Sequence, residues 1–306
     1  MNSVGTGRRL LVAAIAVVGL LALGTPAALA NDGHHVPGTG TPGDGDGVVQ
    51  YVNMGDSYSA ASGVLPPAPG APPQCLQSLR NWGHLLADRW DYALTDVSCG
   101  AAETRHFTEP QYPGVAPQVQ ALSDETDVVT LTIGGNDSGV FIGTIVACAT
   151  AAAVTAGTGN PCEQQNGDRF TDTIENVTYP DLVRTLETVK AAAPNARIGI
   201  AGYLQILPEE RGCYPIMPVA VGDVPYINGI QATLNDAVRR AAEATDVTYI
   251  DVTEASQGHD ACRPIGTRWV EPGLLGTNPV VVHPNALGEA AMADRAAAEL
   301  GPGPQR

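Results

Sequence analysis

The stretch "YVNMGDSYSAASG", residues 51–63, runs from an apolar segment into a turn that carries Ser57 two residues after Gly55. The apolar part has the length and composition of a buried strand. Gly, Asp and Ser also form ordinary turns, so this stretch alone leaves two interpretations of Ser57. It is either a turn residue or a nucleophile presented at the end of a strand, and the rest of the chain has to decide.

Short β-rich segments alternate with longer helical ones after this stretch. Several of the β-rich segments are continuously apolar, as in parallel strands that helices cover on both faces. The alternation predicts an α/β fold, a three-layer α/β/α sandwich around a doubly wound, mostly parallel five-stranded sheet. We expect strands at 48–54, 92–97, 128–133, 197–203 and 247–252, and helices at 82–90, 140–153, 179–193, 226–244 and 286–300.

The first 30 residues have the pattern of an export signal. Two arginines precede an uncharged apolar run at 10–23, and Ala28-Leu29-Ala30 has the small residues of a cleavage site. We expect cleavage near Ala30 and a secreted mature chain, with an uncleaved anchor as the alternative. No later segment has 18 uninterrupted apolar residues, so we expect no stable membrane insertion.

The remaining chain divides by composition into three parts. Residues 31–47 are rich in glycine and poor in apolar residues, which predicts a flexible linker. The region 48–301 is long enough for one sizeable α/β domain, and residues 302–306 are expected to form a loose tail. No internal repeat is present.

The chain is strongly acidic. Its formal net charge is −16, and removal of Arg8 and Arg9 with the signal would make it −16 − 2 = −18. Such a surface repels nucleic acid and anionic lipid headgroups, so we expect no nucleic-acid partner. No long apolar stripe is apparent, and we expect a monomer that acts on a small-molecule or lipid substrate.

Six cysteines remain after the signal, an even number that predicts disulfides in an exported protein. Six cysteines allow 15 pairings, and pairing in sequence order would give three local loops worth about 3 to 4 kcal/mol each. No two cysteines lie within five residues of each other and none has a histidine at ligand spacing, so we predict no metal site. We also expect no cofactor. The cysteines are Cys75, Cys99, Cys148, Cys162, Cys213 and Cys262.

Chemically useful residues follow the predicted strands. Ligands bind beyond the carboxyl ends of parallel strands, so these positions form one rim. The blocks "GDS", "CGAAET" and "GGND" follow the first three strands, and "VVVHP" precedes the last helix. They bring four candidates to that rim: Ser57, Gly100, Asn136 and His283.

These residue types suit acyl transfer. A histidine such as His283 activates a serine hydroxyl by removing its proton. The N–H groups of Ser57 and Gly100 and the side chain of Asn136 would stabilise the oxyanion that forms on the attacked carbonyl. Each residue alone has an ordinary alternative, since Asn136 suits a helix cap and His283 a surface position.

Together, the blocks "GDSYS", "CGAAET", "TIGGND" and "HPNALG" resemble the GDSL or SGNH hydrolase family over residues 48–300. The six cysteines and "GHDAC" at 258–262 resemble its secreted actinobacterial esterases, lipases and phospholipases. The resemblance implies a flavodoxin-like sheet, with Ser57 as nucleophile, His283 as general base, and Gly100 and Asn136 in the oxyanion hole. It also implies disulfides in sequence order: Cys75 with Cys99, Cys148 with Cys162, and Cys213 with Cys262.

One position departs from the family pattern. Many members have an aspartate three residues before the histidine, where this chain has Val280. An aspartate there would hold the imidazole tautomer, and a valine side chain does not. We expect the backbone carbonyl of Val280 or Val281 to accept the Nδ1 proton of His283 instead, with Asp260 or Glu271 as the alternative.

The sequence thus predicts a secreted serine hydrolase that cleaves carboxylic esters, an esterase or lipase, through an acyl-enzyme on Ser57. A phospholipase A or a polysaccharide deacetylase would use the same chemistry. A non-catalytic binding module on the same scaffold is the other alternative, because fold alone does not establish activity. Loops 63–73 and 150–168 are expected to shape the acyl site.

Overall fold

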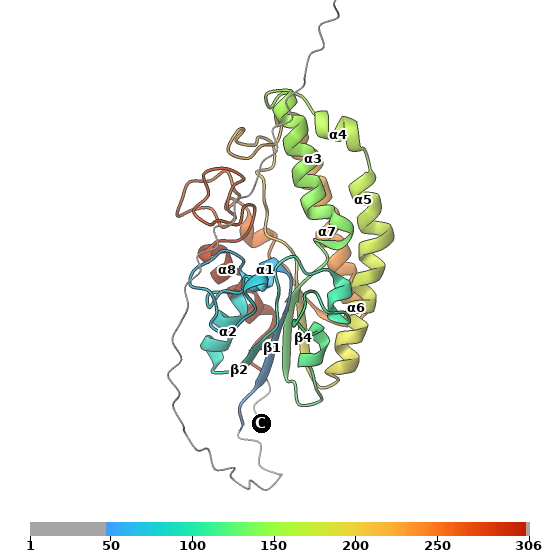
Figure 1. Cartoon of the computed structure of the whole chain (residues 1–306), viewed down its shortest axis with the longest axis vertical. Helices are drawn as coiled ribbons and strands as arrows, with labels where there is room; N and C mark the ends of the chain where they lie inside the picture. The colour runs from blue at the N-terminus through green and yellow to red at the C-terminus, as the bar shows by residue number, and fades with distance from the viewer. Residues whose placement is uncertain (1–46, 304–306) are drawn as a thin grey trace, which may run out of the picture. The chain divides into compact units, whose positions relative to one another are not determined.

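A computed structural model describes residues 47–303. The predicted export signal, residues 31–46 of the linker and residues 304–306 of the tail lie outside the described residues. Five strands form one sheet, with every neighbouring pair parallel, in the order β2-β1-β3-β4-β5 (Figure 1). The strands are β1 (Gln50–Gly55), β2 (Ala93–Asp96), β3 (Val128–Thr132), β4 (Arg197–Ala201) and β5 (Thr248–Ile250).

Helices cover both faces of the sheet, which confirms the predicted α/β/α sandwich (Figure 1). On one face α2 (Trp82–Trp90) packs against α8 (Ala286–Leu300). On the other, α6 (Tyr179–Ala192) packs against α7 (Val224–Ala244). The chain adds β2 on one side of β1 and then adds β3, β4 and β5 on the other side. Ligands are expected where the direction of addition changes, at the carboxyl ends of β1 and β3.

All five predicted strands and all five predicted helices are present, with ends that differ by at most two residues. The helix α7 begins two residues before the predicted start because Pro225 is tolerated in a first helical turn. The helix α3 spans Val140–Val154. The sequence did not predict α1 (Ser57–Ala60), α4 (Pro161–Asn166) and α5 (Arg169–Thr173), which are too short for a periodic apolar pattern.

Shorter turns connect these elements. The 3-10 turns lie at Pro73–Cys75, Thr104–Phe107, Gln118–Ala121, Asp137–Gly139, Val221–Asp223 and Glu254–Ser256, and a π-helical turn lies at Ile174–Thr178. The turns at Thr104–Phe107 and Asp137–Gly139 follow β2 and β3 and therefore border the expected site.

Three disulfides bridge the described region, paired in sequence order as the family resemblance implies. They join Cys75 to Cys99, Cys148 to Cys162, and Cys213 to Cys262, with sequence separations of 24, 14 and 49 residues. The first of them fixes the segment that follows β2, close to the expected site.

The helix α3 is unusually apolar. The stretch Asp137–Val154, which contains it, is by length and composition the one helical stretch of the described region that could cross a membrane. One third of that stretch, 33%, is buried inside the protein, so most of this apolar surface is exposed or partly exposed.

Candidate active site

Ser57 and His283 lie in direct contact. Ser57 begins α1 immediately after β1, and its Oγ is 2.7 Å from Nε2 of His283, which precedes α8. The turn before Ser57 requires glycine, because Gly55 has a φ of +111° and a Cβ there would lie 2.1 Å from the carbonyl oxygen of Thr132. Two segments that are 226 residues apart in sequence thus meet at the ends of the strands.

The imidazole of His283 is oriented by the backbone. Its Nδ1 lies 2.7 Å from the carbonyl oxygen of Val281, and donation of the Nδ1 proton to this oxygen leaves Nε2 as the acceptor facing Ser57. Val280 makes no such contact, and its N–H donates to Oδ1 of Asn278 at 2.9 Å. Of the two carbonyls predicted, the structure places that of Val281 at the ring.

The segment around His283 is fixed at three successive carbonyls. The carbonyl of Val281 binds the imidazole, that of Val282 accepts from the hydroxyl of Tyr58 at 3.1 Å, and that of His283 accepts from the N–H of Glu271 at 2.9 Å. The histidine is therefore preorganised by its own loop and by two neighbouring segments.

The two carboxylates considered as alternative partners lie in other interactions. Glu271 forms a buried ion pair with Arg268 at 2.7 Å, and Asp260 accepts from Arg263 at 3.1 Å. Burial raises the pKa of Glu271, but hydrogen bonds from Thr277, Asn285 and Arg268 outweigh it, so the pKa lies below its ordinary value. Glu271 thus supports the backbone of the histidine loop and makes no hydrogen bond to the ring.

Burial also affects His283 itself. It lowers the pKa of the imidazole below its ordinary value of 6.5, and the hydrogen bond to Val281 opposes this shift in part. His283 is consequently neutral at neutral pH, the form in which it can accept a proton from Ser57.

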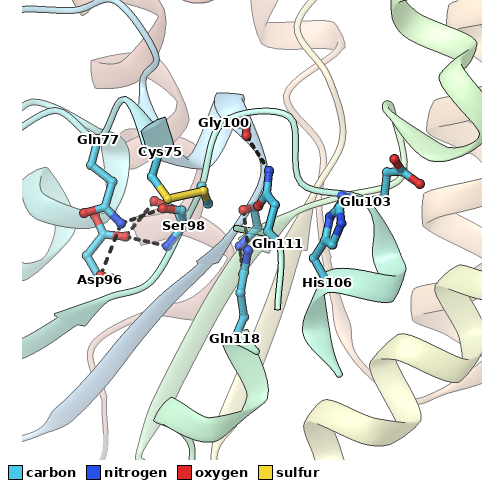
Figure 2. The surroundings of a disulfide bond; sticks show 11 residues. Cys75, Gln77, Asp96, Ser98, Gly100, Glu103, His106, Gln111 and Gln118 are labelled. Carbon is cyan, nitrogen blue, oxygen red and sulfur yellow. Dashed lines mark hydrogen bonds between the residues drawn. A yellow bond between two sulfur atoms is a disulfide. The ribbon is translucent and has the colours of Figure 1, made fainter. Parts of the chain in front are cut away.

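The loop after β2 departs from the prediction for Gly100. The N–H of Gly100 donates to the carbonyl of Cys75 at 2.8 Å, and its carbonyl accepts from Nε2 of Gln111 at 2.7 Å (Figure 2). The Gly100 N–H is therefore occupied within the loop that the Cys75–Cys99 disulfide anchors. The next residue, Ala101, has a φ of +61°, and its N–H has no hydrogen-bond partner among residues 47–303.

Asn136 and Asp137 connect the loops that follow β2 and β3. The Nδ2 group of Asn136 donates one hydrogen to the carbonyl of Ala102 at 3.0 Å, which leaves its second hydrogen available. Asp137 accepts from the N–H and the hydroxyl of Thr104 at 2.9 and 2.8 Å. Asn136 does not cap a helix with its side chain.

Two residues that the sequence did not single out hold the strand ends together. The hydroxyl of Tyr203 donates to Asp56 at 2.5 Å and accepts from the N–H of Gly135 at 2.8 Å. Gln118 binds both the N–H and the carbonyl of Gly55, at 2.7 and 2.9 Å (Figure 2). No local pattern identifies these residues, because their roles depend on which strand ends become neighbours.

An apolar cavity of about 170 Å³ is lined in part by Tyr58 and Val282, the chain neighbours of Ser57 and His283. The ring of Phe141 lies edge-on to His283 with 5.5 Å between ring centres, and Phe141 also lines the cavity. Loops 63–73 and 150–168, which were expected to shape the acyl site, contribute none of its lining. Its walls come from α3, α7 and the segments 203–219 and 273–282, and include Ile145, Leu207, Met217, Ile230, Leu234 and Val282.

Comparisons with known proteins identify the family of this chain. A relative named Lipase 2 from Streptomyces coelicolor is 52% identical over 96% of this chain and 97% of its own length. The crystal structure of phospholipase A1 from Streptomyces albidoflavus has a TM-score of 0.70 and 25% identity, covering 82% of this chain and 99% of that one.

A second crystal structure, of an extracellular lipase from Streptomyces rimosus, has a TM-score of 0.69 and 22% identity, over 82% of this chain and 100% of that one, and supports the fold. The family model described as "GDSL-like Lipase/Acylhydrolase family" matches residues 54–291, which include both Ser57 and His283. The chain therefore belongs to the GDSL-like lipase/acylhydrolase family.

Proposed function

We propose that this carboxylic ester hydrolase uses Ser57 as its nucleophile and His283 as its general base. The observation that carries the proposal is the 2.7 Å contact between Ser57 Oγ and His283 Nε2, with the opposite ring nitrogen bound to a carbonyl. The same contact argues against a binding module without catalysis, because a buried serine that serves only a turn has no need of a neutral, oriented imidazole.

The reaction proceeds in two halves. His283 takes the hydroxyl proton as Ser57 Oγ attacks the ester carbonyl, and a tetrahedral intermediate with a negative oxygen forms. His283 then gives this proton to the departing alcohol, which leaves an acyl-enzyme. His283 then takes a proton from water as the water attacks the acyl group, and it returns this proton to Ser57 Oγ when the second tetrahedral intermediate collapses and releases the acid.

We assign the oxyanion hole to the N–H of Ser57, the N–H of Ala101 and the free Nδ2 hydrogen of Asn136. The N–H of Cys99 donates to the carbonyl of Gly55 at 2.9 Å, so the segments that follow β1 and β2 run side by side. Ala101 lies two residues after Cys99 on one segment, and Ser57 lies two residues after Gly55 on the other. This register supports Ala101, in place of Gly100, as the donor from the loop after β2.

The apolar cavity supports an acyl group as the part of the substrate that is recognised. A cavity of about 150 Å³ with apolar walls holds a benzene molecule, so 170 Å³ suits an acyl chain of roughly six carbons. A polysaccharide deacetylase would need only room for an acetyl group beside a polar sugar groove. We therefore favour esters of medium-chain fatty acids, with a phospholipase A activity as the second candidate because of the structural similarity to phospholipase A1.

We also propose that the protein is exported, cleaved near Ala30 and monomeric. The three disulfides and the similarity to an extracellular lipase support export, since disulfides persist in oxidising compartments. Intact-mass analysis of the secreted protein would locate the cleavage site, and a mass that includes residues 1–30 would contradict the proposal.

The test is hydrolysis of p-nitrophenyl esters from acetyl to palmitoyl by the purified protein, with Ser57→Ala as the control. We expect activity that rises from acetyl to the medium chains and disappears in Ser57→Ala. An organophosphonate probe should label the parent protein but not the variant. A folded parent protein that neither hydrolyses any ester nor reacts with the probe would refute the proposed mechanism.

A further inference from the structure

Large apolar side chains are exposed beside the acyl cavity. On α3, Ile142 and Val146 are 58% and 56% exposed. On the loop that leads to His283, Leu274 and Leu275 are 52% and 81% exposed. Together with exposed Ile216 we name these residues the apolar rim: Ile142, Val146, Ile216, Leu274 and Leu275.

The apolar rim is continuous with the cavity. Phe141 and Ile145, which line the cavity, are each followed directly on α3 by a rim residue. The N–H of Leu274 donates to the carbonyl of Ile216 at 2.9 Å, which joins the two loops of the rim, and the neighbouring Gly273 also lines the cavity. The rim thus borders the cavity on two sides.

Leu275 is held in an unfavourable conformation. Its φ of +60° lies in the left-handed region, which a leucine rarely adopts. Its side chain is 81% exposed, so packing of the side chain contributes little to holding this conformation. The loop thus presents a large apolar side chain to the outside beside the cavity.

The segments that carry the apolar rim contain no charged side chain. Residues 138–162, 213–222 and 272–282 have no Asp, Glu, Lys or Arg, although the chain has 32 acidic and 16 basic residues. Contact with an apolar phase would therefore not require the desolvation of a charge. The net charge of −16 on the remainder would repel an anionic membrane.

We propose that the apolar rim docks onto the surface of a lipid aggregate without net charge, such as a zwitterionic bilayer or an ester droplet. Docking buries Ile142, Val146, Leu274 and Leu275 at the interface and places the cavity opening against the acyl chains. An acyl chain then passes from the lipid into the cavity without crossing water. This inference rests on the proposed esterase function and adds the physical state of the substrate.

The first experiment measures binding to phosphatidylcholine vesicles by co-sedimentation, in the Ser57→Ala background so that hydrolysis does not alter the lipid. Two separate double variants, Leu274→Ser/Leu275→Ser and Ile142→Ser/Val146→Ser, remove the two halves of the rim. Leu79→Ser is the matched control, since Leu79 is also exposed but borders the β2 edge, away from the cavity. We expect each double variant to lower the partition coefficient about tenfold or more, and the control to leave it unchanged.

The second experiment measures kcat/KM on soluble p-nitrophenyl butyrate with Ser57 intact. The rim residues do not line the cavity, so both double variants should retain the parent value within about twofold. On phosphatidylcholine vesicles or an ester emulsion the same variants should lose most of their activity.

The outcomes separate the two proposals. A parent protein that hydrolyses the soluble ester but does not bind the vesicles overturns lipid docking and leaves the esterase proposal intact. A folded parent protein that hydrolyses no soluble ester would refute the esterase proposal instead. Docking is also overturned if binding requires anionic lipid, or if the rim variants bind as the parent does. Dissociation of a parent dimer by the rim substitutions would assign the rim to a contact between copies.

Discussion

At the scale of single residues, the partner of His283 is the most unusual feature of the site. The carbonyl of Val281 fixes the tautomer and the orientation of the ring, as an aspartate would. It carries only a partial negative charge, so it stabilises the imidazolium that forms during the reaction less than a carboxylate would. The loss is limited by preorganisation, since the neighbouring carbonyls of Val282 and His283 are also hydrogen-bonded.

The first prediction concerns the valine at the position of the family aspartate. Val280→Ala should leave kcat/KM on p-nitrophenyl butyrate within about twofold of the parent, because the ring of His283 is held by the carbonyl of Val281 and the substitution retains the backbone carbonyls. His283→Ala, the control, should lose about four orders of magnitude or more. A comparable loss in a folded Val280→Ala protein would show that the side chain matters.

The second prediction concerns the pH dependence of activity. Burial lowers the pKa of His283, and only the neutral imidazole accepts the Ser57 proton, so activity is lost as the pH falls through the folded-state pKa. The acid limb of kcat/KM should therefore have its midpoint below the ordinary histidine value of 6.5. A pH–rate profile on a soluble ester would measure it, and a midpoint above 6.5 would contradict the expectation.

The third prediction concerns Asn136. Its amide supplies one donor to the proposed oxyanion hole and one to the carbonyl of Ala102. Asn136→Ala should lower kcat by about 10² to 10³, as the loss of one oxyanion donor does elsewhere, with a smaller change in KM. A change in KM alone would place Asn136 in substrate binding.

At the scale of elements, the loop after β2 depends on the Cys75–Cys99 disulfide. Cys75→Ala/Cys99→Ala should reduce the free energy of unfolding by about 3.5 kcal/mol, from a 24-residue separation. It should also lower kcat on p-nitrophenyl acetate at least tenfold, because the bond anchors the loop that positions Ala101.

The control for this prediction is the disulfide between Cys213 and Cys262. Its separation of 49 residues makes it worth about 4 kcal/mol, more than the first. Removal should nevertheless leave kcat on the acetyl ester, which does not fill the cavity, close to the parent value. Equal losses of kcat in the two variants would show a general effect of reduced stability.

The elements were largely predictable, and the finer contacts of the site were not. The alternation of short β-rich and longer helical segments predicted all five strands and the five long helices, and the placement of the blocks at strand ends predicted that Ser57 and His283 lie at the same rim. The N–H of Gly100 donates to the carbonyl of Cys75, and this hydrogen bond forms only once the loop has folded and its peptide groups need partners. The cavity walls depend on the packing of α3 against the segment 203–219, which no local pattern specifies.

At the scale of the whole molecule, several buried acids affect stability in one direction. Burial raises the pKa of Asp56 and Asp137 from 3.8 to about 6, and that of Glu289 well above its ordinary 4.5, although hydrogen bonds oppose each shift. Above pH 4 the unfolded chain releases protons that the folded protein retains. The free energy of unfolding contributed by these groups therefore falls as the pH rises through their folded-state pKa values.

The fifth prediction concerns how the melting temperature depends on pH. The lowered pKa values of Glu271 and His283 act in the opposite direction, but the net charge of −16 adds self-repulsion as the pH rises. The melting temperature should be highest near pH 5 and fall towards pH 8, measured by calorimetry. Glu289→Gln, which keeps an acceptor for the N–H of Trp82, should make the fall shallower by up to about 4 °C per pH unit.

The control is Asp88→Asn on the surface of α2, which should leave the slope unchanged. A Glu289→Gln protein with the same slope as the parent would show that the buried carboxyl of Glu289 does not titrate in this range.

The separate origins of the reacting pair and of the acyl cavity have a consequence for how this enzyme can diverge. Ser57 and His283 are held by strand ends and by a hydrogen-bonded loop, whereas most cavity walls come from α3, α7 and the segment 203–219. Substitutions at Ile145, Met217 or Ile230 can thus change the preferred acyl length while the chemistry is preserved. Selection, natural or in a library, can tune specificity on one part of the chain and leave reactivity to another.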